Sequence, residues 1–159
     1  TFWKAMSVTV GGASASAYSV ALDRVVTKLK ITANDAVPDG TATVVVLPER
    51  WYYGLDYLTG EPVDMHDSEE MSASVPASMV GTTGMAVSFF GFSSATEWTT
   101  PLTVSARDAA NAIIGMVNVE AAPFMANRAT EFSGALFSTS GTFTITLNDE
   151  WDAPWTGTW

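Results

Sequence analysis

Apolar and polar residues alternate along much of this chain with the period of a β-strand. The clearest run covers residues 142–148, where Phe143, Ile145 and Leu147 alternate with threonines. Successive side chains of a strand point to opposite faces of a sheet, so this run would have one apolar and one hydroxyl-rich face. We therefore expect a half-buried strand here.

A second strand-like run covers residues 129–137, directly before this one. The sequence Ser-Thr-Ser-Gly at positions 138–141 separates the two runs. Two strand-like runs joined by a short segment that contains glycine are typical of a β-hairpin. The pattern predicts an antiparallel hairpin with a four-residue loop.

Two strands are predicted before residue 34. Met6, Val8 and Val10 alternate with Ser7 and Thr9, which predicts a short strand ending at a Gly-Gly pair. The longest strand-like run, 18–33, changes phase near residues 23–24. A β-bulge at that point would produce such a change.

The rest of the chain supplies further strand-like runs and few convincing helices. These runs are Thr43–Leu47, Met85–Phe92, Leu102–Arg107 and Ala112–Val119. Strands at close spacing indicate an all-β protein, and we predict an antiparallel two-sheet β-sandwich. The 159 residues suit one domain, 1–159, which would bury about 70% of the unfolded chain's surface.

The segment Asp56–Met79 has no clear periodicity. We expect a long loop, which in a compact domain is usually functional or mobile. It contains six carboxylates, no Lys or Arg, and the sole histidine, His66. Carboxylate oxygens suit Ca²⁺ and similar cations, but the spacing does not match an EF-hand. A solvated acidic surface is the preferred interpretation, and no metal site is predicted.

The charge balance excludes several classes of partner. Seven Lys and Arg residues against seventeen Asp and Glu give a net charge of −10. Nucleic acids and anionic membrane surfaces attract cationic proteins, so neither is expected as a partner. No apolar run is long enough to predict a transmembrane segment. No signal-peptide pattern follows Thr1, so we expect the chain to begin downstream of any export leader.

The sequence contains no recognisable catalytic motif. It has no cysteine, no phosphate-binding Gly-Lys loop and no Gly-x-Ser-x-Gly turn. We therefore predict no catalytic residue, no cofactor and no enzyme activity. A pair of carboxylates for glycoside hydrolysis stays open, because only geometry selects such a pair among seventeen acids.

Aromatic residues provide an alternative function. Trp51, Tyr52 and Tyr53 could form a platform that stacks on a sugar ring, although such residues more often supply core area. The alternative is a carbohydrate-binding β-sandwich module or a fragment of a glycan-processing enzyme. Exposed coplanar rings would favour it, and buried rings would count against it.

Three tryptophans lie in the last eleven positions of the sequence. Trp151, Trp155 and Trp159 share the odd parity of the apolar residues in 143–147. Pro154 and Gly157 interrupt any regular strand. We expect a tryptophan-rich flap packed across one end of the sandwich, with a pairing strand for a neighbouring subunit as the second possibility.

Two segments resemble a known family. The sequences NRATEFSGALF and LDRVVTKLKI are similar to segments of the Bacteroidetes fimbrillin and fimbrillin-associated proteins, which build and anchor bacterial surface fimbriae. The matching positions are Asn127, Arg128, Thr130, Gly134 and Leu136 in the first segment, and Leu22, Arg24, Val26 and Lys28 in the second. These motifs are structural, and the resemblance extends over roughly residues 18–151.

The resemblance implies a transthyretin-like β-sandwich and a non-enzymatic role in cell adhesion. Family members are exported, often as lipoprotein precursors, to the cell surface or outer membrane. They join other fimbrial subunits by β-strand addition, and a host or bacterial surface protein or glycan is a further expected partner. Unlike many accessory members, this chain has one predicted domain and no leader, so subunit, anchor and tip roles stay open. We expect the strand-exchange edge at Met6, Val8, Val10, Phe143, Ile145 and Leu147.

Overall fold

The computed structural model describes residues 1–9, 11–12, 17–138 and 143–148. Its strands are β1 (Phe2–Trp3), β2 (Asp23–Arg24), β3 (Val26–Ala33), β4 (Thr41–Pro48), β5 (Arg50–Leu55), β6 (Pro62–Asp67), β7 (Met71–Ser74), β8 (Met85–Phe92), β9 (Trp98–Asp108), β10 (Ile113–Phe124), β11 (Ala129–Gly134) and β12 (Phe143–Asn148). A 3₁₀ turn, η1 (Ala77–Met79), lies between β7 and β8.

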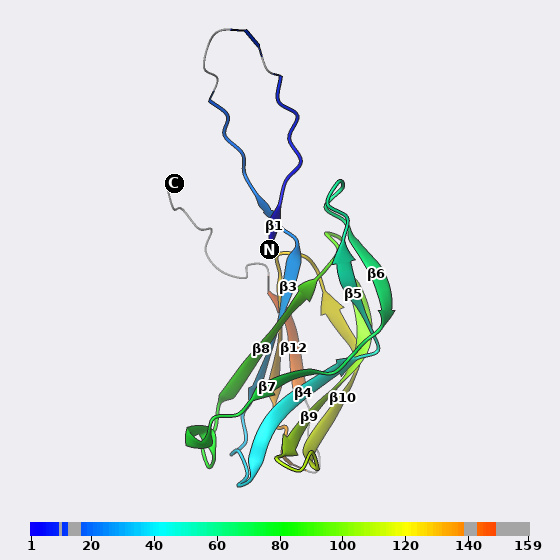
Figure 1. Ribbon diagram of the computed structural model, residues 1–159. Coiled ribbons are helices and arrows are strands. Elements are labelled where there is room, and N and C mark those ends of the chain that lie inside the picture. The colour runs from blue at the N-terminus through cyan, green and yellow to red at the C-terminus, as the bar shows by residue number, and fades with distance from the viewer. Residues whose placement is uncertain (10, 13–16, 139–142, 149–159) are drawn as a thin grey trace.

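The strands form two principal layers (Figure 1). One is a six-stranded sheet in the order β12-β11-β3-β8-β5-β6, and the other is a four-stranded sheet in the order β10-β9-β4-β7. β1 and β2 pair separately. This arrangement confirms the all-β sandwich. One pair, β3 with β11, is parallel, whereas the prediction was antiparallel throughout.

β3 shows how the alternation builds the core. Leu29, Ile31 and Ala33 are buried between the sheets, and Lys28 and Lys30 lie on the outer face. Near residues 23–24, where a β-bulge was predicted, the structure has a break between two strands: β2 ends at Arg24 and pairs with β1, and β3 begins at Val26 and pairs with β8 and β11. The predicted strand nevertheless started too early, since residues 18–22 belong to no strand.

The motif that resembles fimbrillins holds the parallel pair in register. Asn127 has a φ of 59°, and its N–H donates to the carbonyl of Val26 at 3.0 Å. The N–H of Lys28 donates to the carbonyl of Arg128 at 3.1 Å. The buried hydroxyl of Thr130 donates to the carbonyl of Pro123. These residues therefore have a structural role.

The carboxylate of Asp35 connects the C-terminal ends of β3 and β11. Asp35 accepts hydrogen bonds from the backbone N–H groups of Leu136, Phe137 and Ser138, at 3.0, 2.7 and 3.1 Å. Leu136 is fully buried, and a Cβ at Gly115 would lie 2.3 Å from its carbonyl oxygen. The segment after β11 is thus fixed between Asp35 and β10.

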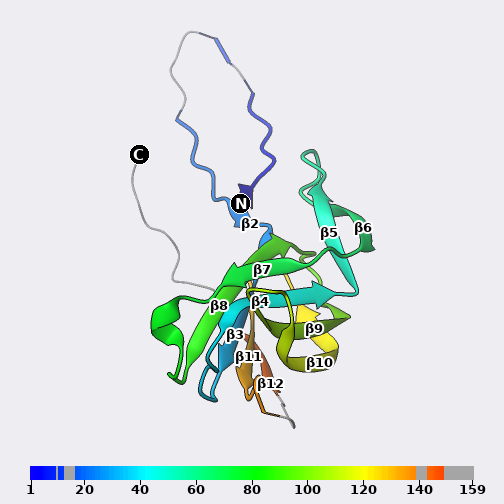
Figure 2. The ribbon, with the colours of Figure 1, turned by 60° about the horizontal axis from the view of Figure 1, so that its bottom comes forward.

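The prediction of a strand over Met6–Val10 is wrong for the residues that the structure describes. Residues 4–9 belong to no strand, Met6 and Val8 are 47% and 43% exposed, and Val10 lies outside the described residues. Residues 4–9 and 17–22 run out from the sandwich (Figures 1 and 2). Alternation alone does not make a strand, because a ladder also needs a neighbour to accept its backbone hydrogen bonds.

The prediction of a long loop over Asp56–Met79 is also wrong, because this segment contains β6, β7 and η1. The β5–β6 turn is closed by a hydrogen bond from the N–H of Asp56 to the carbonyl of Glu61, at 2.9 Å, with Gly60 at a φ of 76°. β6 is an edge strand and largely exposed, so its side chains carry no hydrophobic period. Figure 2 shows this hairpin standing away from β11 and β12.

The hairpin of β11 and β12 is confirmed as an antiparallel pair running from Ala129↔Asn148 to Gly134↔Phe143. Phe143 stacks on Phe132 with ring centroids 5.8 Å apart, whereas Ile145 is 37% exposed. The loop residues 139–142 lie outside the described residues, as do Trp151, Trp155 and Trp159.

Replacing Asp35 with Ala should destabilise the fold, because three backbone N–H groups lose a charged acceptor. A hydrogen bond to a charged group contributes roughly 1.5–3 kcal/mol, and because such bonds on one carboxylate are not additive, we expect a loss of about 3 kcal/mol. Urea unfolding measures the change. Asp39→Ala is the control, since within the described part of the chain the Asp39 carboxylate accepts a hydrogen bond from the N–H of Gly40 alone, at an exposed turn. Equal effects of the two substitutions would contradict the role of Asp35.

A surface ion pair should make stability depend on acid pH. Arg107 of β9 donates to both carboxylate oxygens of Glu70, and this hydrogen bonding lowers the pKa of Glu70. A lowered folded-state pKa stabilises the protein above the unfolded-state pKa, near 4.3, and that contribution is lost as the pH falls through the folded-state pKa.

Glu70→Gln should therefore lower the urea midpoint at pH 7 and have less effect at pH 3. The control is Glu69→Gln, since Glu69 takes part in no ion pair among the described residues. A difference between wild type and Glu70→Gln that stays constant with pH would refute the linkage.

Candidate functional site

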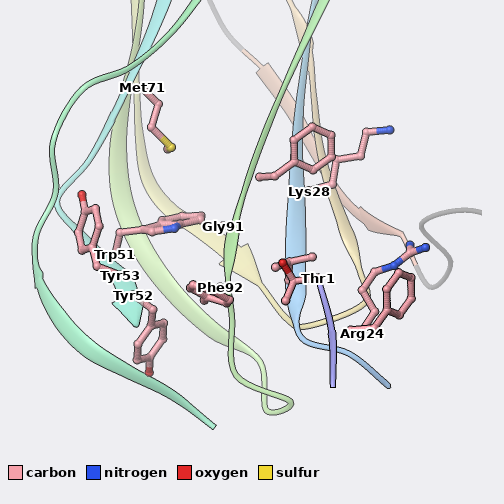
Figure 3. A pocket seen from close by; sticks show the side chains of 12 residues that line it. Thr1, Arg24, Lys28, Trp51, Tyr52, Tyr53, Met71, Gly91 and Phe92 are labelled. Atoms are coloured by element: carbon pink, nitrogen blue, oxygen red, sulfur yellow. The ribbon is translucent and has the colours of Figure 1, made fainter. Parts of the chain in front are cut away.

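An open groove of about 680 Å³ crosses β8 on the six-stranded sheet. β5 and β8 pair only at Tyr52↔Phe92, so the strands diverge beyond that point. In Figure 3 the aromatic residues of β5 lie on one side of β8, and Arg24 and Lys28 lie on the other. The residues lining this groove are Thr1, Phe2, Arg24, Val26, Lys28, Trp51, Tyr52, Tyr53, Met71, Phe90, Gly91 and Phe92.

Trp51 borders the groove from within the core. Its side chain is only 4% exposed and meets the rings of Trp98 and Phe124 edge-on, with centroids 5.6 and 4.9 Å away. A Cβ at Gly91 would lie 2.0 Å from the indole nitrogen, so the indole packs directly on the main chain of β8. Trp51 therefore offers no flat exposed face for stacking on a sugar.

The two tyrosines beside Trp51 are held in different ways. Tyr52 is half-buried and meets Trp98 edge-on at 5.2 Å. Tyr53 is 39% exposed and stacks on His66 at 4.3 Å, and its hydroxyl accepts a hydrogen bond from the N–H of Glu69 at 2.7 Å. Trp51, Tyr52 and Tyr53 thus form no coplanar exposed platform, which counts against the carbohydrate-binding alternative.

The opposite side of the groove is cationic and apolar. The guanidinium of Arg24 lies 5.1 Å from the centre of the Phe2 ring, within cation–π range. Lys28 stands directly opposite Phe90 in the β3–β8 register, and Phe90 is 57% exposed. Both side chains point outward, because the residues that alternate with them on the two strands are buried in the core.

The acidic residues near β6 do not converge. The His66 Nε2 and the Asp64 carboxylate lie 3.8 Å apart, and the described residues contain no group of three or more side chains suited to hold a metal ion. Asp56 accepts a hydrogen bond from the N–H of Leu58 at 2.8 Å, which lowers the pKa of Asp56. Asp56 thus stabilises the β5–β6 turn.

The segments expected to form a strand-exchange edge lie in different parts of the molecule. Phe143, Ile145 and Leu147 belong to β12, at one edge of the six-stranded sheet. Met6 and Val8 lie on the segment beyond β1, and the described residues show no main-chain pairing between that segment and β12. Of the two predicted segments, only β12 is an edge strand of a principal sheet among the described residues.

A family model matches residues 1–159 of the sequence. The chain belongs to DUF6562, a family of unknown function. No curated protein matches the sequence of this DUF6562 member. In the described part of the chain, no helix is long and apolar enough to cross a membrane.

A solved structure shares the fold of this DUF6562 protein. It is described as a "putative cell adhesion protein" from Bacteroides ovatus ATCC 8483, and it superposes with a TM-score of 0.50 at 15% sequence identity. The match covers 80% of this chain and 45% of the other, so this chain spans less than half the length of that protein. At this identity the likeness establishes the fold alone.

Sequence reasoning missed the cationic side of the groove. Phe89 and Phe90 are neighbours in an apolar run, yet Phe89 is 7% exposed and Phe90 is 57% exposed. Because side chains alternate along a strand, the two rings must lie on opposite faces of the sheet, but the sequence does not say which face is buried in the core. The partnership of Phe90 with Lys28 comes from the β3–β8 register, which the sequence does not encode locally.

Gly91→Ala should destabilise the DUF6562 protein, because the added methyl group would overlap the indole of Trp51. Overpacking of this kind typically costs about 1–3 kcal/mol, measured here by urea unfolding. Gly11→Ala is the matched control, since a Cβ at Gly11 meets nothing within 4 Å. A Gly91→Ala protein as stable as this control would show that the indole does not pack on β8.

Proposed function

We propose that the chain is a non-enzymatic component of a bacterial cell-surface fimbria, acting in adhesion and assembled by β-strand addition. It would be an exported protein of the cell surface or outer membrane, with other fimbrial subunits as its partners. Two observations support this proposal: the fold shared with the Bacteroides ovatus protein, and the placement of the fimbrillin-like motif in β3 and β11.

The outer edge of β12 is the observation that carries the proposal. β12 pairs with β11 on one side, and no described strand pairs with its other side. Its sequence, FTITLN, contains no charged residue and no proline, and Thr144, Ile145 and Thr146 are exposed. An uncharged edge rich in β-branched residues is well suited to accept a strand through its backbone groups.

The opposite edge of the same sheet is protected. β6 begins at Pro62, carries the charged residues Asp64 and Asp67, and has a positive φ of 60° at Asp64. Proline, inward or outward charges and backbone irregularities are features that discourage pairing at an edge. This asymmetry directs strand addition to β12.

The incoming strand has a candidate in the segment beyond β1. Met6 and Val8 alternate with polar residues and are about half exposed in a stretch that forms no ladder of its own. On a neighbouring subunit, their alternating side chains would enter pockets while the backbone pairs with β12. The adhesive partner would be a host or bacterial surface protein or glycan.

The double substitution Thr144→Lys and Thr146→Lys should prevent assembly, because lysines on an edge strand oppose the addition of another strand. Light scattering with size-exclusion chromatography over a range of concentrations measures the oligomers. The matched control is Ala86→Lys with Ser88→Lys, on the same outer face but on β8, which lies inside the sheet.

Wild type and the control should form oligomers that grow with concentration, while the β12 variant stays monomeric. Val8→Asp should also block assembly, and Ser7→Asp, on the opposite face of the same segment, should not. A wild-type protein that stays monomeric, or assembly that survives in the β12 variant, would refute assembly through this edge.

A further inference from the structure

Two exposed stretches of chain, residues 4–9 and 17–22, run out from the sandwich between β1 and β2 (Figure 1). We call each stretch a leg and the two together the arm. Every residue of both legs is exposed, and neither leg belongs to a strand. An exposed cluster of large apolar side chains marks an interaction surface. The arm has five such side chains, each between 43% and 54% exposed: Met6, Val8, Tyr18, Val20 and Leu22.

The pairing of β1 with β2 predicts how the two legs would pair. It is antiparallel and ends at Trp3↔Asp23, where the legs begin. All five apolar residues have even numbers, so this register, continued outward, places them on one face of a two-stranded ribbon. The opposite face would carry only small or hydroxyl-bearing side chains. The apolar face contains the pairs Met6↔Val20 and Val8↔Tyr18 together with Leu22, and the opposite face contains Ala5, Ser7, Thr9, Ala17, Ser19 and Ala21.

Side-chain contacts hold the legs together at both ends. Near β1, the ammonium of Lys4 lies 2.7 Å from the carboxylate of Asp23. At the other end, the hydroxyl of Tyr18 donates to the carbonyl of Thr9 at 2.9 Å. The described residues of the legs form no ladder with each other between these contacts. The arm therefore has two strands' worth of backbone groups held side by side outside any sheet.

The base of the arm is anchored on the β5–β6 turn. The indole N–H of Trp3 donates to the carbonyl of Tyr57 at 2.9 Å. A Cβ at Gly60 would lie 2.3 Å from the indole ring, so the ring packs directly on this turn. Trp3 has an odd number, so its side chain belongs to the face opposite the apolar one. The anchoring contact thus leaves the apolar face of the arm uncovered.

The edge of β12 matches the arm in length and in chemistry. Each leg has six residues, as does β12. Thr144 and Thr146 lie on the outer face of the sheet, and Ile145, opposite the buried Phe132, lies on the core-facing side and is 37% exposed. Added beside β12, the apolar face of the arm would continue the side of Ile145, and its hydroxyl-bearing face would continue the side of the threonines.

We propose that the arm is donated to a second copy of the chain as a two-stranded unit. Leg 4–9 pairs with β12 of that copy, and leg 17–22 pairs with leg 4–9 in the register of β1 and β2. A single added strand would itself become an unpaired edge, and leg 17–22 is tethered where it can cover that edge. Lys4 is the only charged residue of the two legs, so donation adds little repulsion between acidic molecules. This inference rests on the proposed function, because it names the partner and the second strand for the same edge.

Val20→Asp tests whether leg 17–22 takes part. The substitution would bury an unpaired carboxylate on the apolar face, so we expect the variant to stay monomeric at concentrations tenfold above those at which wild type assembles, measured by light scattering with size-exclusion chromatography. Val63→Asp is the matched control, since Val63 is 43% exposed and lies on β6, at the opposite edge of the sheet. The control should assemble like wild type.

A disulfide between the legs tests their register, because the chain has no cysteine of its own. Ser7→Cys with Ser19→Cys places the thiols directly opposite each other, where Cα atoms about 4.5–5.5 Å apart suit a disulfide. The bond is formed by oxidation in dilute solution, so that it closes within one molecule. The cross-linked protein should assemble at a concentration several-fold lower than its reduced form, because the donated unit is preorganised. The matched control, Ser7→Cys with Ala21→Cys, is displaced by two residues and should assemble less readily when cross-linked than when reduced.

The outcomes separate this inference from the proposed function. If wild type assembles and Val8→Asp prevents assembly while Val20→Asp does not, a single leg is donated, and only the two-stranded unit is overturned. Loss of assembly in the protein cross-linked between positions 7 and 19 would overturn the same inference, because it would show that the legs separate. Equal assembly of the two cross-linked proteins would refute the register. A wild type that stays monomeric at every concentration, or assembly that survives the lysines on β12, would overturn both proposals.

Discussion

The parallel pairing of β3 with β11 is the constraint on which the rest of the structure depends. Parallel neighbours cannot be joined by a tight turn, so the chain must leave β3, cross the protein and return. Within that crossover it builds the whole four-stranded sheet and the strands β5, β6 and β8. The bonds at Asn127, Arg128 and Asp35 fix both ends of the pair, and through it the hairpin partner β12.

The sequence predicted a strand correctly where one face of the strand packs on the core and the other face points to solvent. In β3, from Thr27 onward, the alternation of residue types follows the alternation of burial, because one face is removed from water more fully than the other. β6 was missed because both of its faces are exposed, so selection for burial leaves no pattern in it. Met6 and Val8 were assigned to a strand because alternation reports side-chain chemistry, while strand formation also requires a backbone partner.

The candidate site was harder to predict than the fold. Trp51, Tyr52 and Tyr53 were identified as notable, and they do border the groove, yet Trp51 is buried, so the three rings do not form an exposed platform. The pairing of Lys28 with Phe90 depends on the register of β3 and β8. Register is set by long-range packing and turn geometry, so these neighbours cannot be derived from local sequence.

The net negative charge of the protein explains why contacts with other molecules would form at two places, the edge of β12 and the groove beside Lys28. A net charge of −10 on each molecule opposes close approach of two copies, most strongly where carboxylates face each other. The outer edge of β12 carries no charged residue, so backbone hydrogen bonds can form there with little electrostatic cost. The groove is lined by Arg24 and Lys28, so it is locally cationic and would attract acidic groups. The uncharged edge of β12 is therefore the surface on which two molecules can meet with least repulsion.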